Sequence, residues 1–185
     1  MSHTASKSAT YADLLALPDH VVGEIVDGEL HASPRPATPH AHVASTLGMD
    51  IGSSFQRGRG GPGGWWILDE PELHLGSDIL VPDLAGWRRE RMPTLPRAPF
   101  IQLAPDWVCE VVSPSTARLD RTGKLPIYAR AEVGHAWLLA PDAHSLEMFR
   151  RDSEHWILIS THSGEQHVRA EPFAAVELEL GALWL

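Results

Sequence analysis

One short apolar run with a single acid in its middle constrains the fold of this chain more than any other segment. Residues Trp107 to Val112 read Trp-Val-Cys-Glu-Val-Val, so apolar side chains would occupy both faces of a strand. Such a run is typical of a strand buried inside a sheet. Glu110 would be buried with it, and a buried carboxylate needs a cation, hydrogen-bond donors or a proton because removing its charge from water is costly.

A second run of the same character precedes the first. Ile79 to Trp87 is also strand-like and apolar, and it carries one acid of its own, Asp83. If the two strands pair, side-chain alternation allows Asp83 and Glu110 to converge at one end of the sheet. Two carboxylates with a lysine nearby are what a magnesium-dependent phosphodiester-cleaving site requires. Lys124 is the candidate, because Lys7 is the only other lysine in the chain.

Each of these residues would have its own role in metal binding or in hydrolysis. We expect Asp83, Glu110 and the backbone carbonyl of Val111 to bind Mg²⁺, or Mn²⁺ in its place, with water in the remaining positions. The metal would lower the pKa of a bound water and neutralise charge that develops on the phosphate. Lys124 would orient the attacking water or stabilise the phosphate.

Other residues of this region leave alternatives open. Glu70 and Glu72 precede Asp83 and could add a metal ligand. Glu72 is the better placed by alternation, provided that the strand expected from Trp65 to Leu75 stays regular past Pro71. Any single acid could instead pair with an arginine or cap a helix. The two acids and the lysine taken together favour a site.

The composition is that of a soluble globular protein. Of 185 residues, 43% are hydrophobic and 21% charged, which suits one domain over residues 10–185 after a polar tail, 1–9, that we expect to be disordered. No apolar run approaches the roughly 18 residues that span a bilayer, so no membrane association is expected. The first residues lack a hydrophobic signal core, and the single cysteine, Cys109, is expected in the core, which together favour the cytoplasm.

Charge is distributed unevenly along the chain. The net charge of −9 argues against a general nucleic-acid coat, yet residues 88–130 hold eight basic residues and four acids. A basic zone around two buried acids is compatible with a phosphate-bearing substrate, and a solvated arginine-rich loop is the plain alternative. Trp87 adjoins this zone and is a candidate for nucleic-acid contact. The expected substrate-binding residues are Arg88, Arg89, Arg91 and Arg121.

Capping and turn residues outline the first half of an α+β fold with a mixed sheet. Thr10 is expected to cap a short helix from Tyr11 to Leu17, with Asp13 completing a capping box. Asp27-Gly28 predicts a hairpin between two short strands. Thr38 is expected to cap a second helix, whose predicted buried stripe is Val43, Leu47, Ile51 and Phe55.

Glycine and proline residues indicate a loop and a helix start in the rest of the chain. Gln56 to Gly64 is rich in glycine and predicts a flexible loop, since it lacks the spacing of a phosphate-binding Walker motif. A regular helix is expected to start near Lys124 with Pro126 in its first turn, where proline is tolerated. Tyr128 on that helix is expected to pack against the sheet. Further strands are predicted at His135 to Ala140, Leu146 to Arg150 and His155 to Thr161.

Several of these stretches resemble a known group of proteins. They include Val81-Pro82-Asp83, the run Glu110-Val111-Val112-Ser113-Pro114-Ser115-Thr116, and then Asp120, Lys124 and Tyr128. Together with the N-terminal Glu24-Ile25-Val26-Asp27-Gly28, they resemble the Uma-type family of small bacterial proteins, labelled restriction endonucleases, within the PD-(D/E)XK nuclease superfamily.

The resemblance implies a restriction-endonuclease-like fold, in which helices flank a central mixed sheet and a helix and β-hairpin lie at the N-terminus. It places the first acid of the superfamily at Asp83 and the second at Glu110. The superfamily lysine usually lies two residues after the second acid, where this chain has Val112. The lysine that this family carries on the next helix corresponds to Lys124. The resemblance adds two secondary candidates, the acid Glu24 and the histidine His40.

Three functions are compatible with these features. The first is a Mg²⁺-dependent endonuclease that acts on DNA, as a homodimer because two sites are needed to cut both strands. The second is a catalytically inactive module that keeps the nuclease fold for nucleic-acid or protein interaction, which the charge of −9 and Pro126 favour. The third is a metal hydrolase of another substrate class, although the sequence has no His-x-x-x-His spacing.

Overall fold

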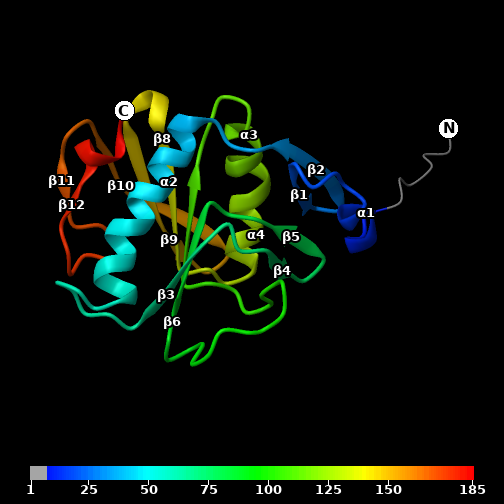
Figure 1. Ribbon diagram of the computed structural model, residues 1–185, viewed down its shortest axis with the longest axis horizontal. Helices are drawn as coiled ribbons and strands as arrows, with labels where there is room; N and C mark the ends of the chain where they lie inside the picture. The colour runs from blue at the N-terminus through cyan, green and yellow to red at the C-terminus, as the bar shows by residue number, and fades with distance from the viewer. Residues whose placement is uncertain (1–7) are drawn as a thin grey trace.

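A six-stranded mixed sheet forms the centre of the protein (Figure 1). The structure, a computed structural model, describes residues 8–185. The strand order is β10-β9-β8-β7-β6-β3, with β7 and β8 parallel and the other neighbours antiparallel. The predicted α+β class with a mixed sheet is confirmed. The strands are β3 (Trp65–Asp69), β6 (Leu84–Arg88), β7 (Trp107–Val111), β8 (His135–Ala140), β9 (Ser145–Asp152) and β10 (His155–Ser163).

A smaller sheet carries the predicted N-terminal hairpin. Its four strands have the order β2-β1-β5-β4 and consist of β1 (Val21–Val26), β2 (Glu29–Pro34), β4 (Leu73–Leu75) and β5 (Asp78–Leu80). Asp27 and Gly28 join β1 to β2 with φ angles of 48° and 81°. Two consecutive positive φ angles are the geometry that an Asp-Gly hairpin turn provides.

The N-terminal helix α1 (Tyr11–Leu15) begins as the sequence predicts. Thr10 is its N-cap, and the side chains of Thr10 and Asp13 form both hydrogen bonds of a capping box. The helix ends two residues before the predicted Leu17. Of the predicted tail, residues 1–9, the first seven lie outside the described residues. Ala9 is described, and its N–H donates to the carbonyl of Gly28 at 2.8 Å.

Two strands that the sequence predicts as continuous are each divided between the two sheets. The run from Trp65 to Leu75 becomes β3 and β4, and the run from Ile79 to Trp87 becomes β5 and β6. Pro71 and Pro82 lie at the two breaks, where a residue without an N–H interrupts strand pairing. Asp83 therefore lies at the junction of the sheets, directly before β6.

The pairing of β6 with β7 brings the two predicted acids to the same end of the larger sheet. Leu84 is the partner of Cys109 in this antiparallel pair. Asp83 precedes Leu84 and Glu110 follows Cys109, so antiparallel geometry carries both acids to one edge.

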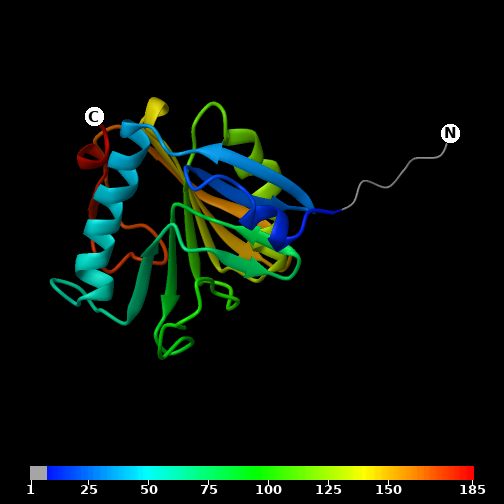
Figure 2. The same ribbon diagram turned by 45° about the vertical axis from the view of Figure 1, so that its right-hand side comes forward.

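Helix α2 (Thr38–Ile51) covers one face of the larger sheet and α4 (Leu125–Arg130) covers the other (Figure 2). The predicted stripe of α2 is confirmed, because Val43, Leu47, Ile51 and Phe55 are all buried. The predicted cap is displaced by one residue: Ala37 is the N-cap, and Thr38 is the first helical residue. A π-helical turn at Gly52–Gln56 extends α2 before the predicted glycine-rich loop begins.

Three consecutive helical segments follow β7. They are α3 (Ala117–Leu119), a π-helical turn (Asp120–Lys124) and α4 (Leu125–Arg130). The regular helix thus begins beside Lys124 with Pro126 in its first turn, as predicted. In a regular α-helix, a proline ring clashes with the carbonyl of the residue four positions earlier. For Pro126 that residue is Thr122, which lies in the wider π-helical turn.

The C-terminal region packs on the α2 face of the larger sheet. Phe173 contacts the rings of Trp65, Trp107 and Trp137 within one aromatic group. The remaining elements are short: β11 (His167–Val168), β12 (Leu178–Glu179) and 3₁₀ turns at Pro141–Ala143 and Leu180–Leu183. Within residues 8–185, no helix has the length and apolar character needed to span a membrane.

Two further predictions concern buried side chains. Cys109 is fully buried, as predicted for a core cysteine. Trp87 was a candidate for nucleic-acid contact, and this is wrong: its side chain is 0% exposed, and its indole N–H donates to the carbonyl of Leu103 at 2.8 Å. Trp87 belongs to the same core cluster as Val108 of β7 and Ile127 of α4.

The packing of α2 predicts a difference between two neighbouring positions. Leu47→Ala should lower the free energy of unfolding by about 2–5 kcal/mol, because Leu47 is 1% exposed and its loss leaves a cavity against the sheet. Met49→Ala is the matched control on the same helix, with a side chain that is 66% exposed, and should change stability by no more than about 0.5 kcal/mol. Urea unfolding followed by circular dichroism measures both, and equal effects would show that α2 does not pack as described.

Candidate active site

A cavity of about 510 Å³ opens where the two sheets, the start of α2 and the α3–α4 segment meet. Its walls come from the hairpin β1–β2, the connector to α2, the junction before β6 and the end of β7. It brings together acids, a lysine and a histidine from segments far apart in the sequence. Seven candidate residues from the sequence line it: Glu24, His40, Glu70, Asp83, Glu110, Val111 and Lys124.

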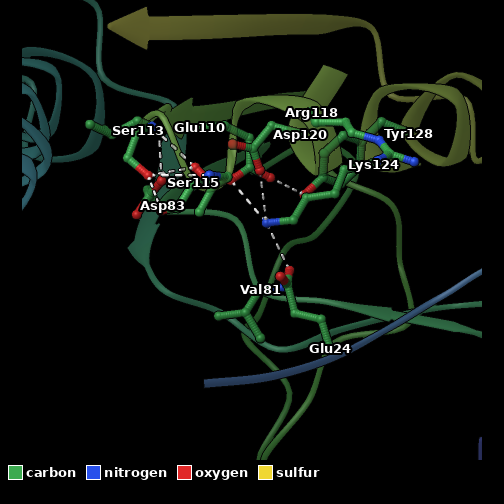
Figure 3. A network of polar contacts seen from close by, with 12 residues as sticks. Glu24, Val81, Asp83, Glu110, Ser113, Ser115, Arg118, Asp120, Lys124 and Tyr128 are labelled. Carbon is green, nitrogen blue, oxygen red and sulfur yellow. Dashed lines mark hydrogen bonds and ion pairs between the residues drawn. The ribbon is translucent and has the colours of Figure 1, made fainter. Parts of the chain in front are cut away.

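The ammonium group of Lys124 lies between three buried carboxylates (Figure 3). Its Nζ atom is 2.9 Å from Glu24 Oε1, 3.3 Å from Glu110 Oε2 and 3.4 Å from Asp120 Oδ1. All four side chains are buried. Since β1, β7 and the helix each supply an acid, one ammonium group joins three elements of the fold.

Tyr128 completes the surroundings of Glu110. Its hydroxyl donates to Glu110 Oε1 at 2.6 Å, while the other carboxylate oxygen of Glu110 faces Lys124. Tyr128 is fully buried and packs the helix onto the sheet as predicted, but its hydrogen bond was not foreseen. Asp120 was likewise not proposed as a site residue. The spacing of Asp120, Lys124 and Tyr128 at intervals of four residues places them on one helix face, and this signal could have identified both.

Burial and mutual repulsion shift the ionisation of this group. Burial raises the pKa of Glu110 well above its ordinary value, and Lys124 only partly opposes this shift. Burial also raises the pKa of Asp120 and of Tyr128. Burial alone would lower the pKa of Lys124, but the neighbouring carboxylates, Glu110 first, outweigh it and raise this pKa. Lys124 is therefore an ammonium ion across the physiological range of pH.

Asp83 is held beside the strand that carries Glu110. Its Oδ2 atom accepts a hydrogen bond of 2.7 Å from the N–H of Val111, and its Oδ1 atom lies 2.5 Å from Nε2 of His40. His40 lies in the first turn of α2, so this contact connects the helix to the junction of the sheets. The arrangement holds the Asp83 carboxylate at the cavity from both sides.

Glu24 also lines the cavity, as the resemblance implied. One oxygen of its carboxylate, Oε1, accepts a hydrogen bond of 2.8 Å from the N–H of Val81 and also faces Lys124. Glu24 therefore connects the hairpin strand β1 to the segment before Asp83.

The preference for Glu72 over Glu70 is wrong. Glu72 does not line the cavity, and its Oε1 atom lies 2.7 Å from Nε2 of His74 in the smaller sheet. Glu70 lines the cavity instead. The predicted alternation fails because the strand breaks at Pro71, and Glu70 itself has a φ of 44° at that break.

The arginines expected to bind substrate do not line the cavity. Asp83 precedes β6 and Arg88 ends it, so about 16 Å of strand separates them. Arg88 and Arg89 stack on Trp65 and Trp66 at 4.7 and 4.0 Å. The other two form ion pairs, Arg91 with Asp106 and Arg121 with Glu147. The guanidinium group at the cavity is that of Arg35, on the connector before α2.

Within residues 8–185, no three His, Cys, Asp or Glu side chains are grouped closely enough to enclose a metal ion. The ammonium group of Lys124 occupies the position between Glu24, Glu110 and Asp120. Asp83 and Glu110 nevertheless border the same cavity, beside the backbone of Val111. Mg²⁺ typically takes one or two carboxylates together with water and substrate phosphate, and this donor set fits that requirement.

Comparison with known proteins identifies the group to which this arrangement belongs. The Uma2 family, described as "Putative restriction endonuclease", matches residues 10–182. The chain belongs to the Uma2 family. No curated protein is significantly similar to it. The family description supports a nuclease-type function.

A crystal structure from Anabaena variabilis has the same fold. It is described as a "putative nuclease belonging to DUF820", with a TM-score of 0.76 and 22% sequence identity. The similarity covers 95% of the protein described in this structure and 97% of the Anabaena chain. It confirms the restriction-endonuclease-like fold class over almost the whole chain.

The three carboxylates around Lys124 predict an unusual pH dependence of stability. Lys124→Met should lower the free energy of unfolding by about 3–5 kcal/mol near neutral pH, because it leaves buried acids without a counter-ion. Folded-state pKa values of Glu110 and Asp120 already lie above their ordinary values, and the substitution raises them further. The folded protein then binds more protons than the unfolded chain, so the stability of the variant falls as pH rises from about 4 towards neutrality.

Urea unfolding of wild type and variant over this pH range measures the difference. Arg130→Met is the control, because it also removes a cation paired with two acids, Asp27 and Asp78, but its own side chain is 51% exposed. It should cost no more than about 1 kcal/mol. The described cluster would be contradicted if Lys124→Met lowered the free energy of unfolding as little as Arg130→Met does, or if its effect on that free energy did not change with pH.

Proposed function

We propose that the protein is a Mg²⁺-dependent endonuclease that hydrolyses phosphodiester bonds of DNA, with Mn²⁺ able to replace Mg²⁺. The observation that carries this proposal is the meeting of Asp83 and Glu110, from neighbouring strands, with the ammonium ion of Lys124 at one cavity. The match of the chain to the Uma2 family supports the same reaction class.

The charge of the cavity supports a requirement for a divalent cation. Its lining includes two basic residues, Lys124 and Arg35, and five acids: Glu24, Glu70, Asp83, Glu110 and Asp120. A cavity with this excess of carboxylates repels a phosphodiester. A bound divalent cation is the largest local charge in such a site and reverses this repulsion.

Three groups of this chain would hold the cation. They are the carboxylates of Asp83 and Glu110 and the backbone carbonyl of Val111, all of which belong to residues that line the cavity. When bound, the cation would supply a water of lowered pKa and neutralise charge on the phosphate. His40 and the N–H of Val111 keep the Asp83 carboxylate at the cavity while the other groups act.

The protonation state of Lys124 limits the role that it can have in hydrolysis. Its raised pKa keeps it protonated, so it does not act as a general base near neutral pH. An ammonium ion held in place by Glu24 and Asp120 is suited to stabilising negative charge on the phosphate. Glu24 and Asp120 are therefore positioning residues in this proposal.

Cleavage of both strands of a duplex requires two such cavities. A homodimer supplies them by symmetry, and we propose this assembly for the active enzyme. Sedimentation velocity at enzyme concentrations that give cleavage determines the assembly, and a monomer at those concentrations would refute it.

Cleavage of DNA tests the assignment directly. Incubation of plasmid and of single-stranded DNA with Mg²⁺ or Mn²⁺ should give nicked or shortened products, and gel electrophoresis detects them. Asp83→Asn and Glu110→Gln should each lower the rate at least about a hundredfold, because each removes one charged group of the site. Glu72→Gln, which neutralises an acid outside the cavity, is the control and should keep full activity. Full activity in both cavity variants would refute the assignment.

Binding of the cation is a separate measurement. Calorimetric titration with Mn²⁺ should show binding to the wild type and to Glu72→Gln, and none to Asp83→Asn or Glu110→Gln. Binding should strengthen as pH rises, because the raised pKa of Glu110 means that a proton must leave before the carboxylate binds a metal. Absence of binding in the wild type would favour the alternative, an inactive module that keeps the fold for interaction.

A further inference from the structure

A second cavity of about 500 Å³ lies along α2 and the π-helical turn that extends it. We call it the α2 groove. One wall is helical, and the floor comes from strands β3 and β6. The residues that matter for its chemistry are Gly48, Gly52, Arg57, Arg59, Ile67 and Leu84.

The α2 groove begins where the candidate active site ends. Ala44 in the groove lies one helical turn after His40 in the active-site cavity. Leu84 in the groove directly follows Asp83. The two cavities therefore have neighbouring lining residues at the junction before β6, and we expect a polymer bound in one to continue into the other.

Small residues keep the groove open. A Cβ atom added at Gly52 would meet nothing within 4 Å, so the space in front of this position is empty of protein atoms. A Cβ atom at Gly48 would come within 3.3 Å of the Leu84 side chain that forms part of the floor. Ile67 and Leu84 make that floor apolar, and Asp69 lies at the end nearest the active site.

Two arginines at the other end have no protein partner. The side chains of Arg57 and Arg59 are exposed, and neither guanidinium group forms an ion pair or hydrogen bond with any residue from 8 to 185. Their backbone is held in place, because their N–H groups donate to the carbonyls of Gly52 and Ser53 at 3.0 and 2.9 Å. This contrasts with Arg89 and Arg91, which are occupied by contacts within the protein.

A guanidinium group presents several N–H donors that match the geometry of a phosphate, and an apolar floor suits a sugar or a base. The volume is that of a pocket for a small ligand, which accommodates unstacked nucleotides and not a duplex. We infer that the α2 groove binds a short single-stranded stretch that leads away from the scissile phosphate, with Arg57 and Arg59 on its backbone. This inference rests on the proposed nuclease function.

One substitution can close the groove without disturbing the core. Gly52 has φ −63° and ψ −37°, which any residue adopts, and its Cβ direction is free. Gly52→Gln therefore places a side chain in the groove, and its urea midpoint should be no lower than that of the wild type because glycine is the weaker helix former. Arg57→Ala and Arg59→Ala test the phosphate contacts independently. Arg97→Ala removes one exposed arginine outside both cavities and is the control.

Fluorescence anisotropy of a short, labelled single-stranded oligodeoxynucleotide measures binding, in an Asp83→Asn background that prevents cleavage. Arg57→Ala and Arg59→Ala should each weaken binding about tenfold, the loss expected for one charge-assisted contact. Gly52→Gln should weaken binding by a similar factor because its side chain occupies the space of the strand. Each arginine variant should also reduce the dependence of log affinity on log salt by about 0.7. Arg97→Ala should bind as the parent does, and none of the three groove substitutions should weaken binding of the duplex of the same sequence, because the groove does not accommodate a duplex.

The outcomes separate this inference from the function on which it rests. If the wild type cuts DNA but the groove variants bind the single strand like their parent, or if the groove substitutions weaken binding of the duplex as much as that of the single strand, the inference is overturned and the nuclease function stands. If the wild type neither binds nor cuts DNA, both are overturned. Weakened binding in all three groove variants, with the control unaffected, supports the groove as the path of the strand.

Discussion

The buried ammonium ion of Lys124 is the interaction on which the rest of the site depends. Glu24, Glu110 and Asp120 come from a hairpin, a central strand and a helix, and each would be an uncompensated buried charge without it. The desolvation cost of such charges in an apolar core is several kcal/mol per ion, so the three elements are stable together only around a shared cation. One lysine thus stabilises the tertiary structure and supplies positive charge to the cavity.

Prolines determine where the acids meet. Pro71 and Pro82 interrupt two long strands, and the chain passes from one sheet to the other at these points. The interruption leaves Asp83 at the junction, where its carboxylate reaches both His40 and the strand that carries Glu110. Pro126 has a comparable effect on the helix, since the wider turn before it contains Asp120 and Lys124. Asp83, Asp120 and Lys124 therefore lie at irregular backbone positions, whereas Glu24 and Glu110 lie within strands.

The electrostatic pattern of the molecule divides into two parts. The cavity that holds Lys124 is acidic, which suits a divalent cation, whereas the α2 groove ends in two arginines whose guanidinium groups have no partner among residues 8–185. A phosphate backbone can approach a protein with a net charge of −9 only where positive charge is locally exposed or a cation is bound. The separation of the two regions along α2 gives one polymer two different kinds of contact.

The sequence by itself determined the local elements and three residues that meet at the cavity. The Asp27-Gly28 turn, the capping box at Thr10, the stripe of α2 and the buried strand around Glu110 follow from short-range periodicity and capping. The meeting of Asp83, Glu110 and Lys124 at one cavity was predicted from strand alternation and from the cost of burying an isolated charge. Only the tertiary structure decided that Glu70 and not Glu72 borders the cavity, that Asp120 faces Lys124 while Tyr128 donates to Glu110, and that Arg88, Arg89, Arg91 and Arg121 lie elsewhere. The spacing of Asp120, Lys124 and Tyr128 places them on one helix face, but which strand they meet depends on tertiary packing. The other outcomes depend on where strands break and which segments then pack together, and contacts between residues distant in sequence decide both.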